Sequence, residues 1–255
     1  MKPEGASPPP SFGEEDRRLS YGSYLKVPEL LSLQDGMTDA HDELLFIVVH
    51  QVYELWFKVL LHELEAAREA MFAGEAFAAR HSLRRVKVIE RLLVEQLEVL
   101  ETMSPQDFLA FRAELAPASG FQSVQFRELE FLSGLKNPAY LKRLETDAGE
   151  RARLERRLRE PTLWDAYLAL VDRQGSPTLE EILRRRQDHA ELFDLAESLL
   201  DHDEAFAHWR SRHVLMVERQ IGDKTGTGGS TGAEYLRTTL GKRFYPALWG
   251  LRSQL

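Results

Sequence analysis

The sequence has no cysteine among its 255 residues. This absence excludes disulfide bonds, thiolate-bound metals, iron–sulfur clusters and cysteine nucleophiles together. Any metal would have to be held by His, Asp, Glu or Tyr side chains. The search for a functional site therefore turns to the eight histidines and the carboxylates.

An excess of basic charge is also missing, since the formal net charge is -8 and the pI is about 5.6. Surfaces that bind nucleic acids are usually basic, so we expect no nucleic-acid partner. The arginine-rich segment 151–159 is a local exception, but its bases are interleaved with acids. We interpret it as a solvated helix with i,i+4 ion pairs.

Long apolar runs and alternating β-branched segments are absent as well. No run reaches the roughly 18 apolar residues of a membrane-spanning helix, and the N-terminus is polar and proline-rich rather than signal-like. We therefore expect a cytoplasmic protein that does not contact membranes. Without strand patterns, the sequence predicts an all-α, bundle-like single domain over residues 19–255, after a mobile N-terminal arm of residues 1–18.

Capping signals and apolar spacing place the expected helices. Thr38 or Asp39 resembles an N-cap, and the helix it opens should end at Gly74. A second long helix is expected over 76–103, and Ser104-Pro105 should start a short helix that holds Phe108 and Arg112. Further helices are expected over 121–132, 138–158, 163–171, 179–221 with an interruption around 200–203, 233–240, and from Tyr245 onward.

One face of the first long helix is apolar except for a histidine. Its members follow the three- and four-residue spacing of a helix, and they are Phe46, His50, Tyr53, Phe57, Leu61 and Leu64. By spacing alone, His50 could be a hydrogen-bonded core residue or a ligand.

The histidines do not form any of the common multi-histidine metal motifs. No Glu-x-x-His pair, no His-Glu-x-x-His motif and no two histidines four residues apart occur. His50 and His213 remain as isolated imidazoles, each in an apolar context on its own helix. Two imidazoles facing each other across an apolar cavity are an arrangement that haem uses for oxygen chemistry.

A glycine-rich loop follows the helix of His213, with five glycines in residues 222–232. Glycine permits positive φ and a close approach of the backbone to a ligand. A nucleotide-binding loop is disfavoured, because Thr231 stands where GxGxxG requires its last glycine and a helix precedes the loop. A glycine C-cap followed by a flexible linker remains the alternative.

Four blocks of sequence resemble tryptophan 2,3-dioxygenase, in the order of that family. They are Tyr21–Leu25, His41–Lys58, Ser119–Arg127, and His213–Gly232 with the following Tyr235–Arg237. The resemblance extends from about Tyr21 to Trp249 and is least specific over 138–203. It implies a mostly helical homotetramer, a dimer of dimers, that binds one haem b per subunit. With O₂ as co-substrate, such an enzyme adds both oxygen atoms across the indole C2–C3 bond of L-tryptophan and yields N-formylkynurenine, the first step of the kynurenine route.

The resemblance also implies roles for residues around the haem. His213 matches the proximal iron ligand, and His50 matches the distal catalytic histidine that accepts a hydrogen bond from the indole N–H. Phe46 matches the ring beside the substrate indole. Ser119 and Gly120 match residues that line the haem pocket.

Other substrate contacts are implied in the same way. Arg112 matches the arginine that binds the substrate carboxylate, although its spacing alone would suit a surface arginine, and Thr227 matches the loop threonine that contacts the substrate ammonium and carboxylate. Phe108 stands where some members have tyrosine, so it cannot donate a phenolic hydrogen bond. Tyr21 and Tyr24 match residues that reach the active site of a neighbouring subunit.

Three alternatives remain open at this point. A related haem monooxygenase or hydroxylase could act on tryptophan, methyltryptophan or tyrosine, and the mass of its product would distinguish it. A non-catalytic sensor would bind haem or an indole without turnover. A plain helical scaffold would show no Soret absorption after haem reconstitution.

Overall fold

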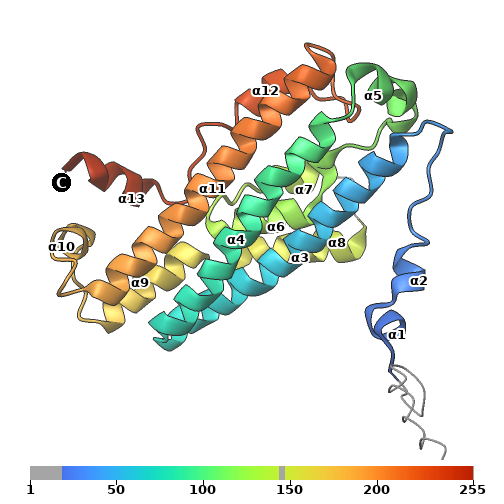
Figure 1. Ribbon diagram of the computed structural model, residues 1–255. Helices are drawn as coiled ribbons and strands as arrows, with labels where there is room; N and C mark the ends of the chain where they lie inside the picture. Colours follow the sequence, from blue (N-terminus) through green and yellow to red (C-terminus); the bar gives the residue numbers. More distant parts are fainter. Residues whose placement is uncertain (1–18, 144–146, 255) are drawn as a thin grey trace, which may run out of the picture. The chain divides into compact units, whose positions relative to one another are not determined.

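The computed structural model describes residues 19–143 and 147–254, and every regular element among them is a helix (Figure 1). The all-α prediction is therefore confirmed, whereas the predicted arm of residues 1–18 lies outside the described residues. The α-helices are α1 Tyr21–Leu25, α2 Val27–Leu30, α3 Glu43–Ala73, α4 Ala76–Glu101, α5 Pro105–Phe111, α6 Val124–Ser133, α7 Tyr140–Arg143, α8 Ala148–Arg159, α9 Leu163–Arg173, α10 Leu179–Arg184, α11 Ala190–Ile221, α12 Ala233–Arg237 and α13 Pro246–Leu251. Three short 3₁₀ helices cover Arg112–Leu115, Gly120–Gln122 and Arg252–Gln254.

The chain divides into two compact units, with the boundary after Gly36. The described part of the first unit holds α1 and α2. Ser20 caps α1 through a reciprocal pair of hydrogen bonds with Ser23, and Lys26 adopts a left-handed conformation between the two helices.

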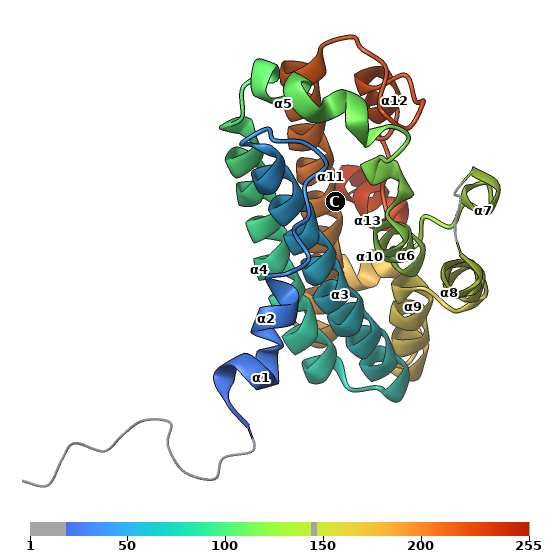
Figure 2. The ribbon, with the colours of Figure 1, turned by 90° about the vertical axis from the view of Figure 1, so that its right-hand side faces the viewer.

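The second unit is built on α3, α4 and α11, with α4 packing against both other helices (Figure 1). On another side of α3 lie α6 and α9, with α8 beyond α6 (Figure 2). Each long helix turns an aliphatic stripe inward. The fully buried leucines and valine at the centre include Leu60, Leu64, Val86, Leu195 and Leu199.

The apolar face predicted for α3 is present, since Tyr53, Phe57, Leu61 and Leu64 are all buried. By length and composition alone, α3 is the one helix of the described residues that could cross a membrane. It packs against α4, α6 and α9, as a core helix does.

The predicted N-cap of α3 is wrong. The helix begins at Glu43 rather than just after Thr38 or Asp39. The Glu43 carboxylate accepts hydrogen bonds from the Met37 and Thr38 backbone N–H groups, at 2.7 and 2.8 Å, and from the Thr38 hydroxyl at 2.6 Å. These bonds hold the preceding turn outside the helix. Thr38 belongs to that turn and is not the N-cap of α3.

The predicted interruption of α11 around residues 200–203 is also wrong, because the helix runs unbroken through them. The two polar residues there face the core. His202 Nδ1 lies 2.5 Å from Glu90 Oε1, and its Nε2 lies 2.8 Å from the Ser133 hydroxyl. The chain breaks earlier, at residues 185–189 between α10 and α11.

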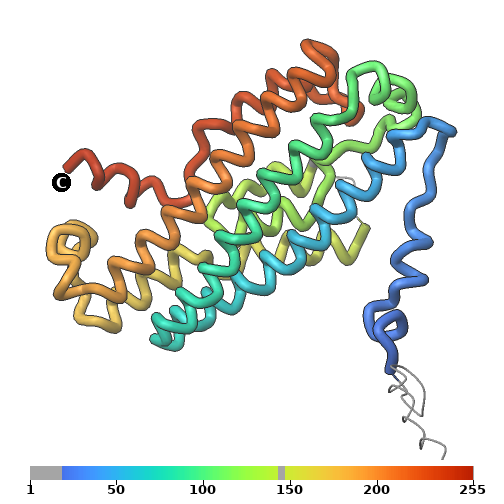
Figure 3. Tube along the Cα trace, in the orientation of Figure 1, coloured from blue at the N-terminus to red at the C-terminus, as the bar shows by residue number. Residues whose placement is uncertain are grey.

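Asp203 of α11 anchors the C-terminal segment that leads into α13. Figure 3 shows the course of this segment in red. Its Oδ2 accepts hydrogen bonds from the Phe244 and Tyr245 backbone N–H groups and from the Trp249 indole, at 2.9, 3.1 and 2.9 Å. The carboxylate is fully buried. Without Asp203, these three N–H groups would lose this hydrogen-bond acceptor inside the protein.

The arginine-rich helix α8 is only partly the solvated helix that its sequence predicts. The expected i,i+4 pairs are present between Arg151 and Glu155 and between Arg156 and Glu160. Arg157, however, is buried, and it donates to three carboxylates, which are those of Glu65, Glu128 and Glu160.

Replacing Asp203 with Ala should lower the free energy of unfolding by about 3 kcal/mol, because three buried donors lose a charged acceptor. Urea unfolding of the purified protein measures this. The matched control is Asp194→Ala on the same helix, where an exposed ion pair to Arg80 is worth at most about 1 kcal/mol. Equal losses in the two variants would contradict the anchoring role.

Candidate functional site

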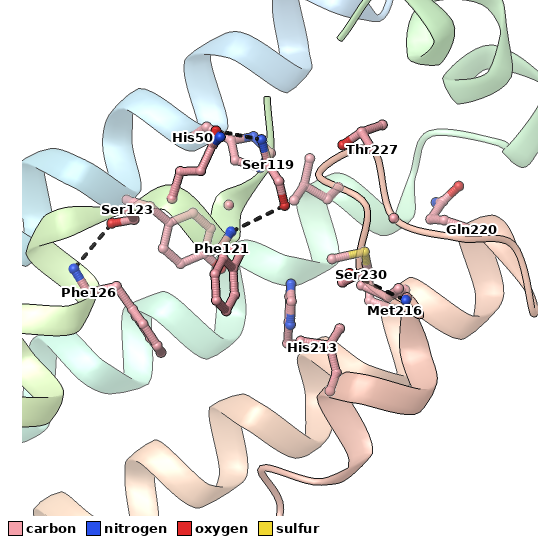
Figure 4. Close-up of a pocket in the computed structure, with 18 of the residues that line it drawn as sticks. His50, Ser119, Phe121, Ser123, Phe126, His213, Met216, Gln220, Thr227 and Ser230 are labelled. Carbon is pink, nitrogen blue, oxygen red and sulfur yellow. Dashed lines mark hydrogen bonds between the residues drawn. The ribbon is translucent and has the colours of Figure 1, made fainter. Parts of the chain in front are cut away.

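A cavity of about 520 Å³ lies inside the second unit. Residues of α3, α4, α6 and α11 line it together with the 112–123 segment and the glycine loop. Figure 4 shows His213 projecting from α11, with His50, Ser119 and Thr227 also around the cavity. Its size falls in the range of small-molecule and cofactor sites, roughly 300–1,000 Å³.

His213 lies on α11 with its ring stacked on Trp209, at a centroid separation of 4.9 Å and an interplanar angle of 7°. Burial and the nearby His50 lower the pKa of His213 to about 4. Among the described residues, no side chain forms a hydrogen bond with this ring. The imidazole is therefore neutral at physiological pH and has a lone pair available for a metal.

His50 lies on α3 and also lines the cavity. Its Nδ1 lies 2.7 Å from the Phe46 carbonyl oxygen, which can only accept. Nδ1 must then carry the proton, and Nε2 is left as an acceptor. Burial lowers the pKa of His50, so this neutral tautomer is the stable form.

Three phenylalanines form an aromatic wall beside His50. The Phe46 ring lies 4.1 Å from the His50 ring, 5.7 Å from Phe108 and 5.5 Å from Phe111, between ring centroids. Phe111 is fully buried and fixes the wall. This arrangement gives a flat aromatic ligand a surface on which to stack.

The glycine loop packs against the 112–119 segment at three points. Arg112 donates a hydrogen bond to the Thr225 carbonyl, and the Thr227 hydroxyl donates to the Ala118 carbonyl at 2.6 Å. A Cβ on Gly228 would lie 2.6 Å from the Ser119 Cβ, closer than such atoms approach. Glycine is required there for the close approach of two backbones.

The structure brings most of the predicted site residues together. His50, His213, Phe46, Phe108, Arg112, Ser119, Gly120 and Thr227 all line the cavity. Tyr21 and Tyr24 lie on α1 in the first unit, where their side chains are 78% and 70% exposed. Their predicted contact with a neighbouring subunit stays a prediction.

Sequence reasoning missed the partners of the cavity histidines. Trp209 is one helical turn before His213, and that i,i+4 spacing could have revealed the stacking.

A buried charged group on the cavity wall was also missed, and it consists of Arg127, Glu130 and Arg210. Arg127 and Glu130 are three residues apart, but no local signal connects Arg210 to them.

A multi-residue metal centre is absent from the part of the chain that the structure describes. No group of three or more His, Asp or Glu side chains there could hold an ion. An iron at His213 would thus need the rest of its ligands from a macrocycle, which is how haem is bound. The apolar lining and the neutral imidazole fit such a group.

A family model and the similar proteins of known name all match this chain to the same family. A family profile described as tryptophan 2,3-dioxygenase matches residues 11–182 and 173–255. The chain is 58% identical to a tryptophan 2,3-dioxygenase of a Nocardioides species, over 96% of this chain and 98% of the relative. It is 46% identical to that of Herpetosiphon aurantiacus, over 93% and 98%, and 44% identical to that of an Anaeromyxobacter species, over 93% and 96%.

Replacing Gly228 with Ala should displace the glycine loop from Ser119, because the added methyl group has no room. Overpacking of this kind costs about 1–3 kcal/mol, so tryptic cleavage after the exposed Lys224 should be roughly tenfold faster. Limited proteolysis followed by mass spectrometry measures the rate. Gly241→Ala is the control, since a Cβ there meets nothing within 4 Å. Unchanged cleavage in the Gly228 variant would contradict the tight contact.

Proposed function

The chain belongs to the tryptophan 2,3-dioxygenase family, whose members oxidise tryptophan to N-formylkynurenine with haem, and from this premise we propose that His213 is its iron ligand and the cavity its active site. The protein is an oxidoreductase with L-tryptophan as substrate. Membership favours the dioxygenase over the monooxygenase, sensor and scaffold alternatives.

The observation that carries this proposal is the state of His213. It is a neutral imidazole, aligned by Trp209, on the wall of a largely apolar cavity. Haem b, one per subunit, would be held there and would supply the iron chemistry that activates O₂. The surrounding apolar side chains would exclude water from the reaction.

We propose that His50 orients the substrate ring. Its Nε2 is an acceptor because Nδ1 donates to the Phe46 carbonyl, so an indole N–H can donate to it. Phe46 lies against His50 and would stack beside the indole. Both residues would hold the indole in one position, which reduces the entropy cost of reaction.

The amino-acid end of the substrate would be bound between Arg112 and Thr227. A guanidinium has five donors, and Arg112 gives one of them to the Thr225 carbonyl, so others remain for a carboxylate. The Thr227 hydroxyl also lines the cavity and donates its proton to the Ala118 carbonyl, so it can accept a hydrogen bond from the ammonium, whereas a bond to the carboxylate would replace the one to Ala118. Phe108 adds an apolar contact without the hydroxyl that tyrosine would bring.

A homotetramer in the cytoplasm completes the proposal. The exposed rings of Tyr21 and Tyr24 and exposed apolar side chains on α3, which are those of Leu44, Val48 and Leu55, suit burial between subunits. Tyr21 and Tyr24 would then complete the site of a neighbouring subunit. The net charge of -8 supports the absence of nucleic acid among its partners.

His213→Ala should abolish tight haem binding, because the iron loses its protein ligand. The Soret spectrum of reconstituted protein and the rate of haem transfer to apomyoglobin measure the loss. His208→Ala on the exposed face of the same helix should behave like the unmodified protein. Tight haem binding retained in the His213 variant would overturn the proposed ligand.

Arg112→Met should lower kcat/KM for L-tryptophan by about ten- to a hundredfold, the value of a charged hydrogen-bonded contact. Turnover of tryptamine, which lacks the carboxylate, should change little and serves as the control. An equal fall for both substrates would show that Arg112 acts through the loop rather than through the carboxylate.

A further inference from the structure

Three polar side chains form a hydrogen-bonded chain through the core, away from the cavity. His202 of α11 lies in the middle, with Nδ1 2.5 Å from Glu90 Oε1 of α4 and Nε2 2.8 Å from the Ser133 hydroxyl of α6. These residues are 1%, 2% and 0% exposed, in that order, and none of them lines the cavity. Groups removed from water so completely depend on one another for hydrogen bonds.

The carboxylate of Glu90 receives few hydrogen bonds for a buried anion. Its Oε1 meets His202, and its Oε2 has no partner among the described residues. The Glu43 carboxylate shows the contrast, because three hydrogen bonds from Met37 and Thr38 lower its pKa. Burial instead raises the pKa of Glu90, although His202 opposes the shift. An ionised Glu90 beside a neutral imidazole is therefore unfavourable in this core.

The other charged and titratable groups around the pair do not supply the missing donor. They come from α4, α11 and the C-terminal segment, and they are Lys87, Asp201, Asp203, Arg210 and Tyr245. Lys87 pairs with Asp201 at 2.7 Å, and Arg210 donates to Glu130. Asp201 and Asp203 raise the pKa of Glu90 further. Burial and the two nearby carboxylates raise the pKa of the Tyr245 hydroxyl, which therefore stays neutral.

One additional proton makes the pair of Glu90 and His202 neutral. The pair is neutral either as an imidazolium beside a carboxylate or as an imidazole beside a carboxylic acid. The Ser133 hydroxyl suits both forms, because it can accept from Nε2 or donate to it. Without this proton the pair carries one negative charge, on a carboxylate whose second oxygen has no donor among the described residues. Such a buried charge is costly.

We propose that Glu90, His202 and Ser133 form a proton-dependent lock that holds α11 against α4 and α6. The unfolded chain loses the histidine proton above about pH 6.5, whereas the folded pair keeps it. Folding then takes up one proton, so stability falls as the pH rises, until the folded pair is deprotonated as well. The inference does not rest on the proposed function, because the three residues lie outside the cavity.

The other shifted groups leave the range from about pH 6.5 to 8.5 nearly free. The pKa values of His50 and His213 are lowered by burial, so both are neutral in this range whether the chain is folded or unfolded. The buried tyrosines keep their protons, because burial raises their pKa values. A hydrogen bond to Asp42 raises the pKa of the exposed His41, but this pair is the same in all the variants below.

Urea unfolding of the full-length protein from about pH 6.5 to 8.5 tests the lock. Glu90→Gln is the decisive variant, because glutamine keeps an acceptor for the His202 N–H but cannot share a proton. At a fixed urea concentration, the unfolding constant of the unmodified protein should rise with pH more steeply than that of Glu90→Gln. The excess should approach about tenfold per pH unit, the value for one proton.

Two further proteins accompany this comparison. Glu90→Leu combined with His202→Ile removes the polar pair with little change in volume, so it should also lack the excess pH dependence. This double variant takes the place of Glu90→Gln if the latter fails to fold. Lys87→Met is the control, since it breaks the exposed ion pair to Asp201 beside the lock and should keep the full excess.

Two results would overturn the lock. An equal pH dependence in the unmodified protein and in Glu90→Gln would show that the folded pair holds no additional proton. Loss of the excess in Lys87→Met, as in Glu90→Gln, would show that any local weakening removes it. Neither result would affect the assignment of the cavity, which is tested separately by haem binding to the His213 variant.

Discussion

The fixed position of α11 is the constraint on which the rest of the structure depends. His202 is held between Glu90 of α4 and Ser133 of α6, and the neighbouring Asp203 holds the C-terminal segment. These bonds fix the helix in rotation and along its axis, because polar groups in a core have few acceptable partners. His213 lies on the same rigid helix, so the position of the imidazole is set by contacts far from the cavity.

The chemistry of the cavity follows from burial rather than from charge. The two imidazoles lose their protons because a charge inside the bundle is poorly solvated. The neutral His213 ring then has a lone pair available for a metal, and the neutral His50 ring presents Nε2 as a hydrogen-bond acceptor. The same burial keeps water away from the guanidinium groups of Arg127 and Arg210, which share the Glu130 carboxylate, so their ion pairs are screened little.

The sequence predicted the parts of the structure that depend on local periodicity. The apolar face of α3, the cap at Ser104 and the stop at Gly74 are properties of a few neighbouring residues, and all three are present. Spacing marked His50 and His213 as isolated imidazoles in apolar surroundings but left open whether they were core residues or ligands. Resemblance to a family then supplied Arg112 and Thr227, which periodicity alone would have left on the surface.

The errors arose where long-range partners decide the outcome. Residues 200–203 look like a polar break, but His202 and Asp203 meet groups more than forty residues away in sequence. Glu43 looks like an ordinary first-turn acid, yet it folds back to Met37 and Thr38. Arg157 looks solvated within its own helix and is buried because α3 and α6 bring carboxylates to it.

The hydrogen bond from Arg112 to the Thr225 carbonyl joins the specificity of the pocket to the conformation of the loop. That hydrogen bond fixes the direction of the remaining N–H groups of the guanidinium, so binding of a carboxylate by Arg112, as proposed, would be coupled to the conformation of the loop. Ligands with a carboxylate and ligands without one would then stabilise the closed loop to different degrees. The choice between indoles with and without a carboxylate would then change how well ordered the backbone of the glycine loop is.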